Sequence, residues 1–70
     1  MNVFEERVVA ERAELERRLT KLDSFIFTEN AVFLALDKED RDLLFNQFTA
    51  MADYSRILAM RIARFALEKD

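Results

Sequence analysis

Neither glycine nor proline occurs anywhere in the 70 residues. Glycine supplies the positive φ angles of tight turns, and proline interrupts helices. We therefore expect long uninterrupted helices, no turn that needs a positive φ, and no glycine-rich phosphate loop. Cysteine and histidine are absent too, which excludes disulfides, zinc–thiolate sites and the commonest general base. A chain this short buries only about 60% of its unfolded surface, so self-association or unusually good packing must stabilise it.

The charge balance narrows the classes of partner. Eleven basic and fourteen acidic residues give a net charge of −3, which argues against non-specific binding to nucleic acid. No apolar run approaches the length of a membrane span, and the first residues lack a signal-peptide pattern. We therefore expect a soluble intracellular protein that needs no membrane. The acidic excess lies in residues 29–42, with five acids and two bases, and a solvated turn is the simplest interpretation.

Apolar spacing predicts one helical domain over residues 1–70. A long helix is expected over about 2–27, although its apolar stripe is interrupted at Glu11 and Arg12. A connector with a short helix follows over about 28–37. A second long helix is expected over about 38–68, with Asp37 as its N-cap and Lys69 favourable near its C-terminus. Its core-facing positions alternate in steps of four and three: Leu44, Phe48, Met51, Ser55, Leu58, Ile62 and Phe65.

These elements predict an all-α fold, an antiparallel helical hairpin with a short connecting helix, which oligomerises into a helical bundle. The short connector returns the chain, so Phe4 should lie near Phe65 and the polar gap at Glu11 and Arg12 near Ser55. The last helix has more apolar surface than one partner helix can cover. A second copy is the simplest partner, because small residues allow close helix approach; the alternative is that the connector covers this face. The expected interface residues are Ala52, Ile57, Ala59, Met60, Ala63 and Ala66.

Three polar and apolar patterns resemble those of a widespread family of small tailed-phage and prophage proteins related to a protein of crAss-like phages. They are R-V-x-x-E-R-x-E-L over residues 7–15, K-L-x-x-F-I over 21–26, and Q-x-x-x-M-x-x-Y-S-x-x-L-x-x-R-I over 47–62. The resemblance covers about residues 7–65. It departs at Asp37, where members often carry proline, which affects the turn.

The resemblance implies a phage protein in the cytoplasm of an infected bacterium. Small helical phage proteins of this kind often look like counter-defence factors. Some bind host immune proteins, and others sequester nucleotide signals such as cyclic dinucleotides or relatives of cyclic ADP-ribose in pockets at oligomer interfaces. The resemblance assigns no binding residue.

Nucleotide sequestration requires an aromatic ring for the base, cations for the phosphates and polar groups for the edges. The candidate ligand-binding residues are Arg12, Lys21, Gln47, Tyr54, Ser55 and Arg61. Each also has a structural interpretation. Tyr54 suits a partly buried interface ring, and Ser55 suits a register-setting position. Arg12 and Arg61 suit ion pairs with a neighbouring helix, Gln47 suits a hydrogen bond between helices, and Lys21 suits a solvated surface.

We predict no enzyme activity, no catalytic residue, no metal and no cofactor, because histidine is absent and Glu11 is the only acid near the polar gap. The preferred function is sequestration of a small nucleotide signal at an inter-helix pocket of a homo-oligomer. The alternative is an oligomeric adaptor or inhibitor that binds a host or phage protein, such as a host defence protein, through an apolar helix face.

Overall fold

Three helices make up the computed structural model, which describes residues 1–67. In chain order they are α1 (Val3–Phe27), α2 (Ala31–Leu34) and α3 (Lys38–Leu67). No strand occurs among the described residues, so the predicted all-α class is confirmed. The predicted last residue of the second long helix, residue 68, and the favourable position of Lys69 lie outside this range. Within it, no helix is both long enough and apolar enough to cross a membrane.

α1 begins with a reciprocal cap. The backbone N–H of Glu5 donates to Asn2 Oδ1 at 2.8 Å, and the backbone N–H of Asn2 donates to Glu5 Oε1 at 3.0 Å. This capping box satisfies two backbone donors that have no partner inside the helix. Caps of this kind contribute about 1 kcal/mol. The cap also explains why the charged side chain of Glu5 is buried.

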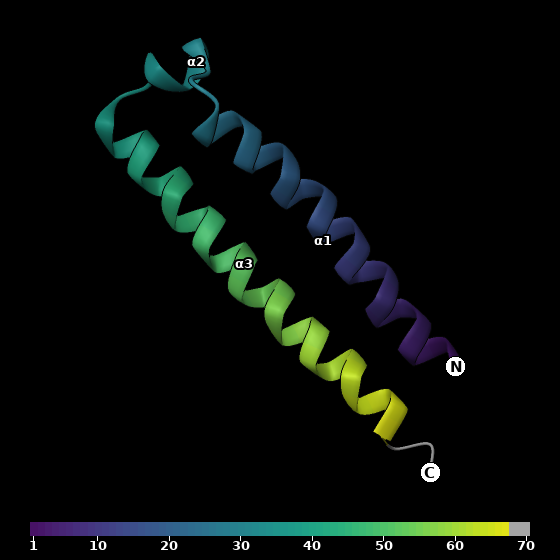
Figure 1. Cartoon of the computed structure of the whole chain (residues 1–70). Coiled ribbons are helices and arrows are strands. Elements are labelled where there is room, and N and C mark those ends of the chain that lie inside the picture. Colours follow the sequence, from purple (N-terminus) through teal and green to yellow (C-terminus); the bar gives the residue numbers. More distant parts are fainter. Residues whose placement is uncertain (68–70) are drawn as a thin grey trace.

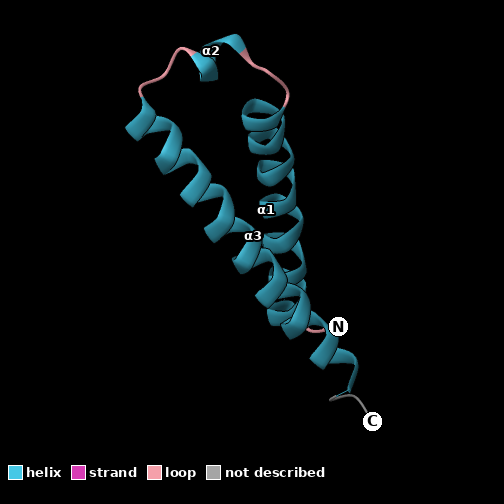
Figure 2. Cartoon of the chain, turned by 60° about the vertical axis from the view of Figure 1, so that its left-hand side comes forward, coloured by secondary structure: helices cyan, strands magenta, loops and turns pink. Residues whose placement is uncertain are grey.

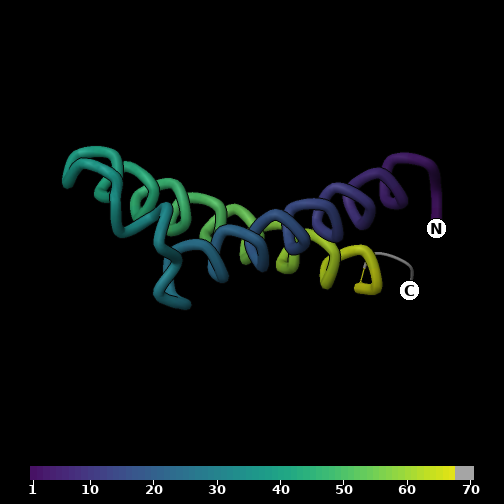
Figure 3. The backbone as a smooth tube through the Cα atoms, turned by 90° about the horizontal axis from the view of Figure 1, so that it is seen from above, coloured from purple at the N-terminus to yellow at the C-terminus, as the bar shows by residue number. Residues whose placement is uncertain are grey.

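α1 and α3 lie side by side and run in opposite directions (Figure 1). The molecule is therefore a rod of about 52 × 16 × 15 Å. At one end the ring of Phe4 on α1 meets that of Phe65 on α3, with centroids 6.3 Å apart, which confirms the predicted proximity of these residues. The helix axes are inclined to each other, and α2 bridges the opposite end (Figures 2 and 3).

The core between α1 and α3 is small. Val8 and Leu15 of α1 pack with Leu58 of α3, which is fully buried, and partly buried apolar residues surround them. These surrounding residues are Leu19, Met51, Ile62 and Phe65. In residues 1–67, five apolar side chains are buried while thirteen large ones remain exposed. One chain therefore leaves much apolar surface in water, and oligomerisation stays a prediction that this surface favours.

The end of the molecule at α2 is held by phenylalanine rings. Asn30 caps α2, because its Oδ1 accepts from the backbone N–H groups of Val32 and Phe33 at 2.9 and 3.2 Å. Phe33 is buried and meets two rings edge to face, one from each long helix. Four ring pairs with centroids 5.5 to 5.9 Å apart connect this group. We call it the aromatic cap: Phe25, Phe27, Phe33, Phe45 and Phe48.

The turn after α1 corrects one expectation from the sequence. Glu29 has a φ of 55°, although a chain without glycine was expected to avoid positive φ. It follows Thr28, the C-cap residue of α1. Helices commonly end with one residue in the left-handed conformation, and a residue with a Cβ pays about 1–2 kcal/mol there. The caps and rings around this turn offset that cost.

Glu29→Gly should therefore stabilise the fold. Glycine adopts the left-handed conformation without the Cβ clash, so the free energy of unfolding should rise by roughly 1 kcal/mol. In a domain of this size, such a gain raises the midpoint of thermal unfolding by about 4–8 °C. Thermal denaturation followed by circular dichroism measures it, and Glu39→Gly, inside α3, should be destabilising instead. A lower midpoint for Glu29→Gly would contradict the strained turn.

Candidate functional site

An open groove runs along one edge of the α1–α3 interface, near α2. Its volume is about 360 Å³. α1 contributes two cations, an apolar residue and an aromatic ring, and α3 contributes an amide and a thioether. We call it the basic groove, and its lining residues are Arg18, Lys21, Leu22, Phe25, Gln47 and Met51.

The two cations of the basic groove differ in their partners. Arg18 Nε lies 3.3 Å from Glu14 Oε1, and Arg17 also pairs with Glu14. The hydrogen bond from Arg17, and then its charge, hold the pKa of the Glu14 carboxyl below its ordinary value, so Glu14 is ionised at neutral pH. No ion pair involves Lys21 within residues 1–67. Lys21 is therefore the cation most available to a ligand in this groove.

Gln47, Met51 and Phe25 also line the groove. Gln47 is exposed, and its Nε2 lies 3.8 Å from the sulfur of Met51, which is a weak contact that a better acceptor can replace. Phe25 is held by an edge contact with Phe33, with ring centroids 5.6 Å apart. The aromatic cap thus holds the Phe25 ring in the position in which it lines the groove.

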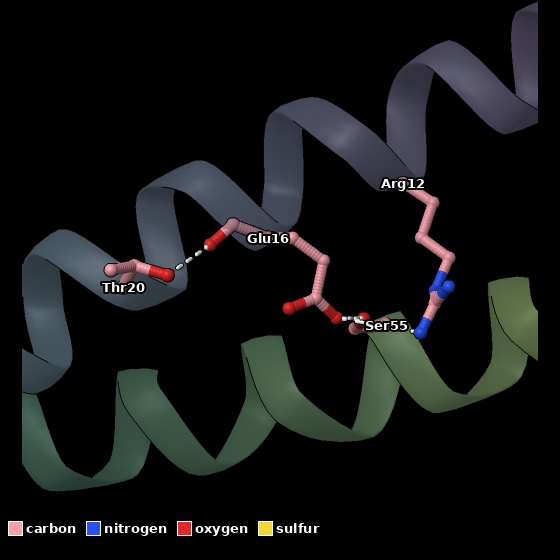
Figure 4. A network of polar contacts seen from close by, with 4 residues as sticks. All are labelled: Arg12, Glu16, Thr20 and Ser55. Carbon is pink, nitrogen blue, oxygen red and sulfur yellow. Dashed lines mark hydrogen bonds and ion pairs between the residues drawn. The ribbon is translucent and has the colours of Figure 1, made fainter.

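A second polar cluster bridges α1 and α3 farther along the pair. The hydroxyl of buried Ser55 donates to Glu16 Oε1, and Arg12 Nη2 lies 3.6 Å from the same oxygen (Figure 4). Thr20 Oγ1 donates to the backbone carbonyl of Glu16 at 3.0 Å. Ser55 is the polar member of the α3 core-facing series, so this contact ties the register of one helix to the other.

The groove beside this cluster has a different character. It measures about 260 Å³ and its lining includes Glu16 and Asp23 but no cation. Two carboxylates repel a phosphate, so this edge of the interface suits an anion poorly. It shares no lining residue with the basic groove, and the helical period places the two grooves on opposite edges of the same interface.

The structure brings together two of the six candidate ligand-binding residues. Lys21 and Gln47 line the basic groove from opposite helices. Tyr54 lies exposed on α3. Arg61 lies with its guanidinium carbon 5.7 Å from the centre of the Phe4 ring.

Arg12 and Ser55 belong to the cluster around Glu16 instead. Two expectations need correction here. Arg12 forms the ion pair with Glu16 that their spacing of four residues on one helix predicts, whereas the interpretation that it pairs with a neighbouring helix is wrong. The polar gap of α1 does meet Ser55, but through Glu16 and not through Glu11.

Sequence reasoning missed four lining residues of the basic groove: Arg18, Leu22, Phe25 and Met51. Met51 belongs to the core-facing series predicted for the second long helix. A signal was present, because Arg18, Lys21 and Phe25 recur at spacings of three and four and so share one edge of a helix.

The described residues contain no group of three or more acidic side chains placed to hold a metal ion. What residues 1–67 form is a small all-α protein with two long helices and a basic, aromatic-lined groove between them.

Comparison with known proteins identifies the family of this chain. A family model named Sequestin matches residues 2–64, and the chain belongs to the Sequestin family. It is also 34% identical over 65 residues to an uncharacterized 7.5 kDa protein in the denB-rIIB intergenic region of Enterobacteria phage T4. The alignment covers 93% of this chain and 98% of the phage protein. No solved structure matches. The comparisons confirm a phage protein family, and the link to crAss-like phages stays a prediction.

Proposed function

We propose that this protein sequesters a small nucleotide signal without transforming it, and thereby opposes a host defence in the cytoplasm of an infected bacterium. The observation that carries the proposal is the basic groove between two helices, where an arginine and an aromatic ring converge with Lys21, which forms no ion pair within the described part of the chain. The family name, Sequestin, and the phage relative support sequestration in a phage setting.

Four of the six lining residues have a defined role in this proposal. Lys21 and Arg18 meet phosphate oxygens, and arginine does so with two parallel hydrogen bonds. Phe25 stacks on a base, an interaction that contributes about 1–3 kcal/mol. Gln47 hydrogen-bonds to a base edge or a ribose hydroxyl. The groove volume of about 360 Å³ falls in the usual range of ligand pockets, roughly 300–1,000 Å³.

Oligomerisation completes the proposed site. The basic groove is open to solvent on one chain, and a tight complex needs most of the ligand surface buried. In this proposal the antiparallel hairpin assembles with other copies into a helical bundle. Tyr54 and Arg61 lie on the same edge of α3 as Gln47, at successive steps of seven residues, so they extend the polar lining toward a neighbouring copy.

Titration of the full chain with a panel of cyclic dinucleotides and cyclic ADP-ribose, followed by thermal shift and calorimetry, tests the proposal. At least one nucleotide should raise the unfolding midpoint. Lys21→Gln should weaken its binding tenfold or more, because a hydrogen bond to a charged group contributes about 1.5–3 kcal/mol.

Arg17→Gln is the matched control. Arg17 lies on the same helix and pairs with Glu14, but it does not line the groove. Its loss should leave affinity within about twofold, since surface ion pairs contribute little. Failure of every nucleotide to bind at high concentration would overturn the proposal, and equal losses in the two variants would move the site away from the basic groove.

A further inference from the structure

We propose that the end of the molecule formed by the aromatic cap docks a basic amphipathic helix of a partner protein. This surface is distinct from the basic groove and goes beyond nucleotide sequestration. It combines exposed apolar side chains, a groove that accepts one side chain, and an acidic rim.

The apolar part is preformed. Phe27 and Phe45 are 56% and 40% exposed, yet their rings lie 5.9 Å apart and contact further rings of the cap. Val32 and Leu34 of α2, at the same end, are 64% and 58% exposed. Edge contacts already hold these rings in place. When a partner covers them, the side chains of this protein therefore lose little further conformational entropy.

A groove of about 300 Å³ opens between α2 and the start of α3, lined by Phe33, Lys38, Arg41, Asp42 and Phe45. Lys38 Nζ is held by Asp42 Oδ2 at 2.7 Å. The rings of Phe33 and Phe45 suit an apolar side chain of the partner. Lys38 and Arg41 disfavour a basic side chain inside the groove itself. An amphipathic helix places such an apolar anchor on one face and its charges on the flanks.

The rim is the set of five exposed acids in the segment that forms this end of the molecule, of which Asp42 lines the groove: Glu29, Asp37, Glu39, Asp40 and Asp42. Within residues 1–67, the ion pairs involve only Asp42 among them, through Lys38. Residues 29–42 thus carry five acids against two bases. Such a field attracts lysine and arginine and repels phosphate.

The charge also selects among occupants. Docking of this surface on the same surface of a second copy would bring two sets of five acids together, which electrostatic repulsion disfavours. The small residues predicted to join copies lie farther along α3: a row of Ala52, Ala59 and Ala66, with Ala63 beside it. A partner with basic flanks around an apolar stripe satisfies both halves of the surface at once.

Fluorescence anisotropy with two labelled 18-residue peptides tests this inference on the full chain without nucleotide. The peptides share one leucine and phenylalanine stripe, and one carries lysine and arginine flanks while the other carries glutamate. The basic peptide should bind at least tenfold tighter, and its affinity should fall as salt is raised. Leu34→Ser should weaken it severalfold through the apolar face.

Charge reversals on α3 provide the matched pair. Asp40→Lys at the rim should weaken the basic peptide severalfold, whereas Asp53→Lys, the same change farther along α3, should not. Lys21→Gln should leave peptide binding unchanged, so the two proposals fail independently. Equal affinity for both peptides, or equal effects of Asp40→Lys and Asp53→Lys, would overturn the inference. A drop in the oligomer mass of Leu34→Ser or Asp40→Lys would also overturn it, because a second copy would then be the occupant.

Discussion

Leu58→Ala should lower the free energy of unfolding by about 3 kcal/mol, since truncating a buried leucine costs roughly 2–5 kcal/mol. Leu58 is fully buried and packs with Val8 and Leu15 at the centre of the small core. The two long helices have few other buried contacts between them, so little can relax into the resulting cavity. A domain of this size has only about 3–5 kcal/mol from such a core, and the variant should be largely unfolded at moderate temperature.

Chemical denaturation followed by circular dichroism measures this change. Leu43→Ala is the matched control, because it is the same substitution on the same helix at a position that is 64% exposed. It should shift the free energy of unfolding by no more than about 0.5 kcal/mol. Similar losses for both variants would show that the assigned core is wrong.

Ala63→Glu should convert the predicted oligomer into single chains. Ala63 is exposed on α3 and is one of the predicted interface residues. If another helix approaches closely there, a glutamate both clashes and buries a charge without a partner, which costs several kcal/mol. Sedimentation equilibrium at micromolar concentration should show the wild type as a dimer or larger and the variant as a monomer.

Ala13→Glu gives the control for that experiment, since Ala13 is an exposed alanine on α1 outside the predicted interface. Its oligomer mass should equal that of the wild type. A wild type that is well folded as a single chain would contradict oligomerisation, and with it the proposal that neighbouring copies complete the nucleotide site. The basic groove belongs to one chain, so the Lys21→Gln titration would still decide whether that groove binds a nucleotide.

Several local features were readable from the chain because their causes are local. The four-and-three spacing of apolar residues in α3 requires only the helical period, and Phe4 meets Phe65 because a short connector must return the chain. Asn30 caps α2, and asparagine is a residue type that favours such caps. The capping box of Asn2 and Glu5 was equally readable, since an asparagine stands three residues before a glutamate.

The sequence alone determined that this protein is made of two long helices and a short connector, because no residue type that breaks a helix is present and apolar spacing sets the buried face. The tertiary structure decided which polar side chains share an edge of that interface. The rotation of each helix and the inclination between them joined Lys21 and Gln47 in the basic groove. The same geometry sent Arg12 and Ser55 to Glu16. Neighbours in space on two helices depend on the rotation of each helix about its axis, and that rotation is set by how the side chains of the two helices pack.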